Sequence, residues 1–129
     1  MKAEDLMIGD WVNLYGSPIK INIDDLGVID RDETYDKGTH CKPIPLTEEI
    51  LEQSGFASVE DQYDHKKYFL LGKNEYNCNV YWDGLAILLV EEDYEPTTYA
   101  YICDVEYVHE LQHALKLCNI KKEIVLCQQ

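Results

Sequence analysis

The chain has 129 residues, with 25 Asp and Glu against 11 Lys and Arg, and a formal net charge of −14. This length suits one domain, and a hydrophobic fraction of 46% is enough to build a core. Direct binding to nucleic acid or to an anionic membrane is not expected, because both need clusters of basic residues and Arg31 is the single arginine. The sequence therefore predicts one acidic domain, residues 1–129.

The location expected for this chain is the cytoplasm. Its longest strongly apolar run, residues 85–90, is far shorter than the roughly 20 residues that span a bilayer. The first residues carry acids where a signal peptide needs an apolar stretch. The five cysteines are odd in number and form no C-x-x-C pair, which favours five reduced thiols over a disulfide framework.

The first third of the chain predicts a small SH3-like β-barrel segment, residues 1–46. Apolar and polar residues alternate over 6–14 and again over 19–23, which is the period of a half-buried strand. A further short strand is expected at 28–29, followed by a polar loop at 30–38.

A short helix is predicted at 47–54. Thr47 has the side chain of an N-cap, and two glutamates follow in the first turn, where the helix dipole favours negative charge. Gly55 is a natural C-terminal stop. Residues 56–66 are polar and predict a loop.

The next segment predicts a four-stranded antiparallel meander. Its expected strands are 68–71, 76–82, 85–90 and 99–103. Asp83-Gly84 is a strong signal for a two-residue hairpin loop of type I′. The strand at 85–90 is apolar on both faces, which predicts a central and well-buried position.

A C-terminal helix is predicted at 105–118, covering one face of the meander and completing an α+β fold. Val108, Leu111 and Leu115 form its apolar stripe, which leaves His109 and His113 outside the core. Asn119 is the expected C-cap, and residues 120–126 either add a last strand or stay loose.

Three blocks of sequence carry a resemblance to a known family. They read IGDxV at 8–12, PIPLTEEIL followed by GF over 43–56, and YVHELQ at 107–112. With these blocks the chain resembles a family of small uncharacterised gut-bacterial proteins, often encoded near prophage or other mobile-element genes. The resemblance implies no activity and no catalytic residue. The chain departs from the family pattern at His113, where the pattern has Asn, and after Leu115.

The C-terminal helix also contains the pattern H-E-x-x-H. His109 and His113 lie one helical turn apart and can hold zinc, with Glu110 polarising a bound water. A catalytic zinc needs a third protein ligand, for which His40 and His65 are upstream candidates. Since no third ligand is apparent, the main expectation is no catalytic residue, no metal and no cofactor, and the zinc site is an alternative.

Two further features bear on binding. Seven of the ten tyrosines lie between Tyr63 and Tyr101, which strand propensity explains unless they make an exposed partner surface. Acids gather at 91–95, either for solubility or to dock on a basic partner. The leading hypothesis is a non-enzymatic protein-interaction module of prophage or mobile-element type. The alternatives are a zinc-dependent hydrolase and a DNA-mimic inhibitor.

Overall fold

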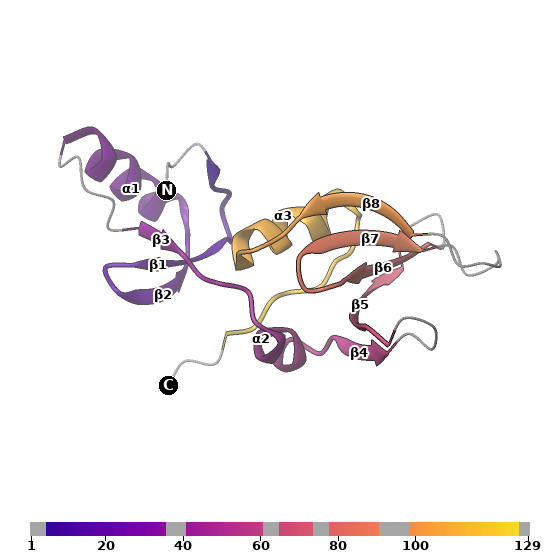
Figure 1. Ribbon diagram of the computed structural model, residues 1–129. Coiled ribbons are helices and arrows are strands. Elements are labelled where there is room, and N and C mark those ends of the chain that lie inside the picture. The colour runs from indigo at the N-terminus through magenta and orange to yellow at the C-terminus, as the bar shows by residue number, and fades with distance from the viewer. Residues whose placement is uncertain (1–4, 36–40, 61–64, 74–77, 91–98, 127–129) are drawn as a thin grey trace. The chain divides into compact units, whose positions relative to one another are not determined.

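The computed structural model describes residues 5–35, 41–60, 65–73, 78–90 and 99–126 (Figure 1). It shows an α+β chain with two antiparallel sheets, which confirms the predicted class. The longest helix in this described part has 13 residues, and none has the length and apolar character needed to cross a bilayer. The chain divides into two compact units. One contains Met1–Pro45 and Tyr107–His109, and the other contains Leu46–Glu106 and Glu110–Cys127.

The N-terminal unit is built on a three-stranded sheet with the order β2-β1-β3. The strands are β1 (Trp11–Leu14), β2 (Ser17–Lys20) and β3 (Cys41–Pro43). Its buried core consists of Leu6, Val12, Ile21, Ile29 and Cys41. Among the described residues of this unit the strands form no closed barrel, so the SH3-like barrel is not confirmed.

Helix α1 (Ile23–Tyr35) corrects the strand predicted at 28–29 and the first part of the loop predicted at 30–38, whose last three residues lie outside the described residues. Asn22 and Asp25 cap the helix reciprocally: each side chain accepts a hydrogen bond of 2.9 Å from the other's backbone N–H. Ile29 is buried in the core, whereas Ile23 is exposed in the first turn. The period-2 alternation therefore ends at Ile21, and the capping pair starts a helix where the sequence suggested strands.

The β1–β2 hairpin turns through Tyr15 and Gly16, which have φ values of 51° and 83°. Two left-handed residues in a two-residue loop define a type I′ turn, in which Asn is favoured over Tyr at the first position. We expect Tyr15→Asn to raise the free energy of unfolding by about 0.5–1 kcal/mol, because Asn adopts the left-handed region more readily. Urea denaturation measures the change, Gly16→Ala should lower stability as a control, and a destabilised Tyr15→Asn would contradict the turn.

The second unit contains a five-stranded sheet with the order β4-β5-β6-β7-β8, helix α2 and all of helix α3 beyond its first two residues. Its elements are α2 (Glu48–Gln53), β4 (Ala57–Glu60), β5 (Lys67–Lys73), β6 (Asn79–Trp82), β7 (Ala86–Val90), β8 (Tyr99–Asp104) and α3 (Val108–Leu117). Consecutive strands pair antiparallel throughout this sheet. The meander predicted at 68–103 is therefore present, with one additional strand.

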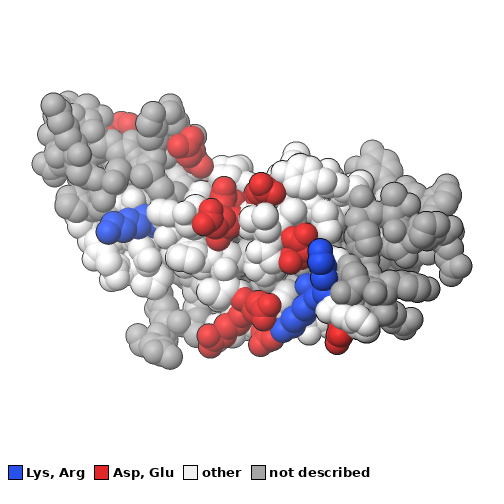
Figure 2. All heavy atoms as spheres, viewed as in Figure 1, with Lys and Arg blue, Asp and Glu red and all other residues white. Residues whose placement is uncertain are grey.

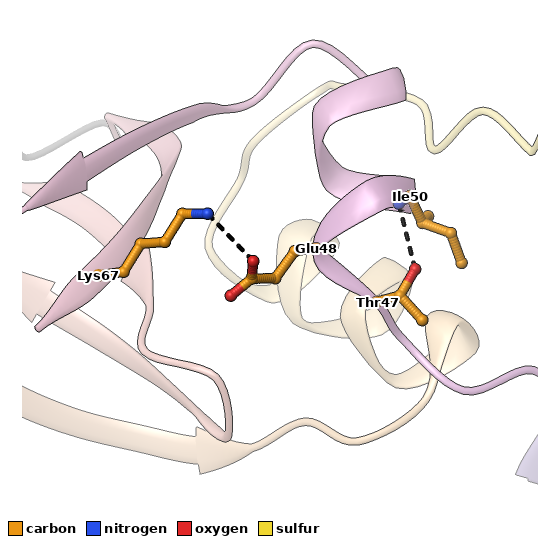
Figure 3. A network of polar contacts seen from close by, with 4 residues as sticks. All are labelled: Thr47, Glu48, Ile50 and Lys67. Atoms are coloured by element: carbon orange, nitrogen blue, oxygen red, sulfur yellow. Dashed lines mark hydrogen bonds and ion pairs between the residues drawn. The ribbon is translucent and has the colours of Figure 1, made fainter.

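Helix α2 forms as predicted. The Thr47 side chain accepts a hydrogen bond of 3.2 Å from the Ile50 backbone N–H, and Gly55 ends the helix with a φ of 87° (Figure 3). Glu48 binds Lys67 at 3.0 Å, which ties the first turn of α2 to the start of β5. Local capping signals were sufficient to locate this element.

Strand β4 corrects the loop predicted at 56–66. All four of its residues are exposed, and it lies at the edge of the sheet beside β5. An edge strand without a buried face carries no alternation of apolar and polar residues, so no periodic signal marked it.

The β6–β7 hairpin joins the predicted strands, but its tip is Gly84-Leu85 instead of Asp83-Gly84. The Asp83 backbone N–H donates to the Ala86 carbonyl at 3.2 Å, which closes a two-residue loop. The Asp83 carboxylate accepts from the N–H groups of Leu85 and Ala86, and Gly84 has a φ of 104°. Leu85 is consequently exposed in the turn and does not begin the strand.

The positions of β6 and β7 in the sheet agree only in part with the prediction. β7 is an internal strand, as predicted, but β6 is the middle of the five. Of the residues expected to share the buried face of β6, Val80 and Trp82 are both buried. Tyr76, at the start of that predicted strand, lies outside the described residues.

Helix α3 presents the predicted apolar stripe, because Val108, Leu111 and Leu115 are all buried. The helix ends in a Schellman motif. Asn119 has a φ of 58° and donates to the Lys116 carbonyl at 3.1 Å, and Ile120 donates to the Leu115 carbonyl at 2.8 Å. Asn119, predicted as the C-cap, is the left-handed C′ residue of this motif, one position beyond the C-cap.

The described tail beyond α3 is neither a strand nor loose. Lys122 donates to the Gly55 carbonyl at 2.7 Å and lies 4.6 Å from the centre of the Phe56 ring. The Val125 N–H donates to the Ser54 hydroxyl at 2.9 Å, and Ile124 is buried. These contacts attach the tail to the C-terminal end of α2.

Candidate functional site

The H-E-x-x-H pattern lies in the first two turns of α3. The Val108 N–H donates to the Ile44 carbonyl at 2.9 Å, and Tyr107 forms a β-bridge with Pro45. The Leu46 N–H donates to the Glu106 carbonyl at 2.9 Å. The segment Ile44-Pro45-Leu46 therefore fixes the start of the helix through backbone contacts.

Glu110 takes part in capping this helix. Its Oε1 accepts a hydrogen bond of 3.0 Å from the Glu106 backbone N–H. A carboxylate in the first turn satisfies one of the unpaired N–H groups and meets the positive end of the helix dipole. This arrangement gives Glu110 a structural function, whereas the zinc alternative needs the same carboxylate beside a metal-bound water.

The two histidines lie outside the core, as predicted, although both are half-buried instead of exposed. The His109 ring is stacked on Tyr107, with centroids 6.1 Å apart and an interplanar angle of 13°. His113 follows one turn later. The helix thus provides two imidazoles at a spacing that suits a metal, and a third ligand must come from elsewhere.

The structure describes one of the two upstream histidines. His65 is 79% exposed and lies 3.7 Å from Glu60, in the connection between β4 and β5. His40 lies outside the described residues. Within the described ranges, no three His, Cys, Asp or Glu side chains are grouped closely enough to hold a metal ion.

We expect the chain, purified without a histidine tag, to carry well under one zinc per molecule. Two ligands at i and i+4 bind a metal weakly, and a catalytic zinc needs three from the protein. Elemental analysis after extensive dialysis measures the content. One tightly held zinc that is lost in His113→Ala would establish the alternative site.

The four described cysteines carry thiols instead of disulfides. They are Cys41, Cys78, Cys103 and Cys118. The predicted fifth thiol, Cys127, lies outside the described residues. Desolvation and the negative charges of Asp104 and Glu110 raise the pKa of Cys103, and desolvation together with Cys103 raises the pKa of Cys118. The Cys103 and Cys118 thiols are therefore protonated at neutral pH and are poor nucleophiles.

Two adjacent cross-strand rows of the five-stranded sheet differ in burial. One cross-strand row joins Phe69, Trp82, Ile87 and Cys103. Its first three members are 1%, 5% and 0% exposed. The adjacent row joins Leu70, Tyr81, Leu88 and Tyr101, and successive residues of a strand point to opposite faces. Leu70, Tyr81 and Leu88 are half-buried and Tyr101 is 62% exposed, whereas Ala86 and Val90, on the same side of β7 as Leu88, are buried. We call these four residues the tyrosine face.

Tyr101 and Asp104 form a polar pair at the edge of the tyrosine face. The Tyr101 hydroxyl donates to Asp104 Oδ1 at 3.1 Å. Partial desolvation, this hydrogen bond and the charge of Asp104 raise the pKa of Tyr101, so its hydroxyl stays protonated at neutral pH. The face therefore combines apolar contact area with one carboxylate.

The sequence left open whether the tyrosines follow from strand propensity or form an exposed partner surface, and it identified no members of such a surface. Of the seven between residues 63 and 101, Tyr81 and Tyr101 belong to the tyrosine face. Tyr68 lies on the same side of the sheet as Leu70, but it is buried and contacts Tyr81 edge to face. The acids at 91–95 that suggested a docking patch lie outside the described residues. Alternation within 78–82 was the available signal, and it separates Tyr81 from Val80 and Trp82.

No protein-family model, curated protein or solved structure matches the chain.

Proposed function

We propose that the chain is a non-enzymatic interaction module that binds another protein through the tyrosine face. The observation that carries this proposal is the row Leu70, Tyr81, Leu88 and Tyr101, which crosses four strands opposite the buried row. Tyrosine and aliphatic side chains at the surface suit the core of a protein interface, because Tyr adds a large contact area at a small entropic cost.

Charge supports a protein as the partner. The chain carries −14, and acids are prominent over the region of α2 in Figure 2, beside a few basic side chains. Such a surface repels phosphate backbones and anionic lipids and attracts basic proteins. The proposed setting is the bacterial cytoplasm, with the chain encoded by a prophage or another mobile element. This setting rests on the sequence resemblance alone.

Site-specific photo-crosslinking tests the function. A photoreactive amino acid placed at Leu88 should capture one defined protein in cells, and the same amino acid at Glu52, an exposed position of α2, should not. Purified chain and captured protein should then form a complex in solution. Capture at Leu88 that is no stronger than capture at Glu52 would contradict the proposal.

The same experiment separates the alternatives. If captured proteins are predominantly basic DNA-binding proteins that DNA displaces, the chain is a DNA mimic. If hydrolysis requires His109, Glu110 and His113 together with zinc, the chain is an enzyme. Neither alternative has a specific contact among the described residues in its favour.

A further inference from the structure

We propose that the tyrosine face receives a cationic segment of its partner, in which an Arg or Lys side chain binds between the Tyr101 ring and the Asp104 carboxylate. Leu70, Tyr81 and Leu88 would contact the apolar residues next to that cation. This inference rests on the proposed function and names the chemistry of the partner.

A β-bulge brings Tyr101 and Asp104 to the same face. Tyr101 pairs with Leu88 and Cys103 pairs with Ile87, so Ile102 is an extra residue in β8. In a regular strand, residues three apart point to opposite faces, whereas the bulge lets the Tyr101 hydroxyl reach Asp104. Bulges re-aim side chains in this way near functional sites. The bulge at Ile102 therefore places Tyr101 and Asp104 within hydrogen-bonding distance.

The pair has capacity for a cation. An ionised carboxylate has about four acceptor positions, and the Tyr101 hydroxyl uses one of them. The Tyr101 ring is mostly exposed, so a guanidinium or ammonium group can lie on its face while it binds the carboxylate. The hydrogen bond to Asp104 also holds the ring in place before the partner arrives.

The chain uses the same combination twice for its own lysines. Lys122 lies 4.6 Å from the Phe56 ring centre and donates to the Gly55 carbonyl. Lys67 lies 5.2 Å from the Phe69 ring centre and binds Glu48 at 3.0 Å. In both places an aromatic ring and an oxygen acceptor hold a cation. The Tyr101–Asp104 pair offers this arrangement to another molecule.

Charge selects the occupant. Two copies of a chain that carries −14 repel each other, which disfavours a second copy on this face. A segment with Arg or Lys beside apolar residues complements both the carboxylate and the tyrosine face. The proposal therefore commits to a cationic and partly apolar protein segment.

A peptide of four Arg-Leu repeats is a suitable probe, with four Glu-Leu repeats as its counterpart. Titrated into the 15N-labelled full chain, the Arg-Leu peptide should shift amide signals of β7 and β8, and the Glu-Leu peptide should not. Tyr101→Ala and Asp104→Asn should each weaken binding about five-fold or more, because each removes one side of the cation site. Tyr101→Phe keeps the ring and should weaken binding less.

Glu52→Gln is the matched control, because it removes one negative charge from an exposed position on α2. Its Kd should stay within about two-fold of the unaltered chain. An equal loss for Glu52→Gln and Asp104→Asn would overturn the site and indicate diffuse charge attraction. Amide spectra of each variant verify folding. If Tyr101→Ala does not fold, the comparison of Asp104→Asn with Glu52→Gln decides the case.

Two other outcomes overturn the inference. Shifts confined to residues outside β7 and β8 would exclude the site, while capture at Leu88 would still support the proposed function. Sedimentation showing a dimer that Tyr101→Ala dissociates would identify a second copy as the occupant. Absence of capture at Leu88 contradicts the proposed function itself, so the two failures are distinguishable.

Discussion

Replacing Leu111 with alanine is expected to lower the free energy of unfolding of the second unit by about 2–5 kcal/mol. Leu111 is fully buried in the middle of α3, and truncation removes apolar contacts and leaves a cavity. The range reflects how far the neighbouring side chains can move into the space. This is among the largest effects that one aliphatic truncation produces in a domain of this size.

Tryptophan fluorescence can report this change selectively. The chain has two tryptophans, Trp11 in the first unit and Trp82 in the second. In a Trp11→Phe background, urea denaturation followed by emission reports the surroundings of the buried Trp82. The free energy of unfolding then belongs to one unit even if the two units unfold separately.

His109→Ala is the control for the helix face, and it should cost under about 1 kcal/mol because a half-buried surface side chain contributes little. Equal costs for Leu111→Ala and His109→Ala would show that the helix buries a different face. A small cost for His109→Ala would show that the stacking on Tyr107, the ring contact that the alanine removes, contributes little to stability.

Local signals made two helices predictable. Thr47 and Gly55 mark both ends of α2 within ten residues, and the stripe Val108, Leu111 and Leu115 fixes the buried face of α3. These features depend on hydrogen bonds and periodicity inside one segment. Helix α1 was not predicted, because it has few apolar residues and because its capping pair, Asn22 and Asp25, follows a strand-like alternation.

The candidate site was less predictable because it depends on pairing between strands. Residues 85–90 are apolar on both faces, so the sequence alone does not assign Leu88 to either face. Extra residues at Leu71 in β5 and Ile102 in β8 reverse the alternation partway along each strand. For the H-E-x-x-H pattern, the sequence identifies two imidazoles within one helix. It does not identify a third ligand, because that ligand depends on the tertiary structure.

Substitutions at two adjacent residues of β7 test which of their side chains is buried in the sheet. Ile87→Ala should lower the free energy of unfolding by about 2–5 kcal/mol, because Ile87 is fully buried between Trp82 and Cys103 in its row. Leu88→Ala should cost less than about 1.5 kcal/mol, because Leu88 is half-buried on the tyrosine face. The same Trp82 emission assay measures both.

A one-residue shift in register would exchange these two costs, since it moves every side chain of the strand to the other face. Similar costs for both substitutions would mean that both faces of the sheet are equally covered, which would remove the basis for the tyrosine face. Binding separates the two residues further. Leu88→Ala should remain folded and bind the Arg-Leu peptide more weakly. Ile87→Ala should bind the peptide normally once stabilising substitutions elsewhere in the chain restore its folding. That contrast distinguishes a side chain that contacts the partner from one that only supports the sheet.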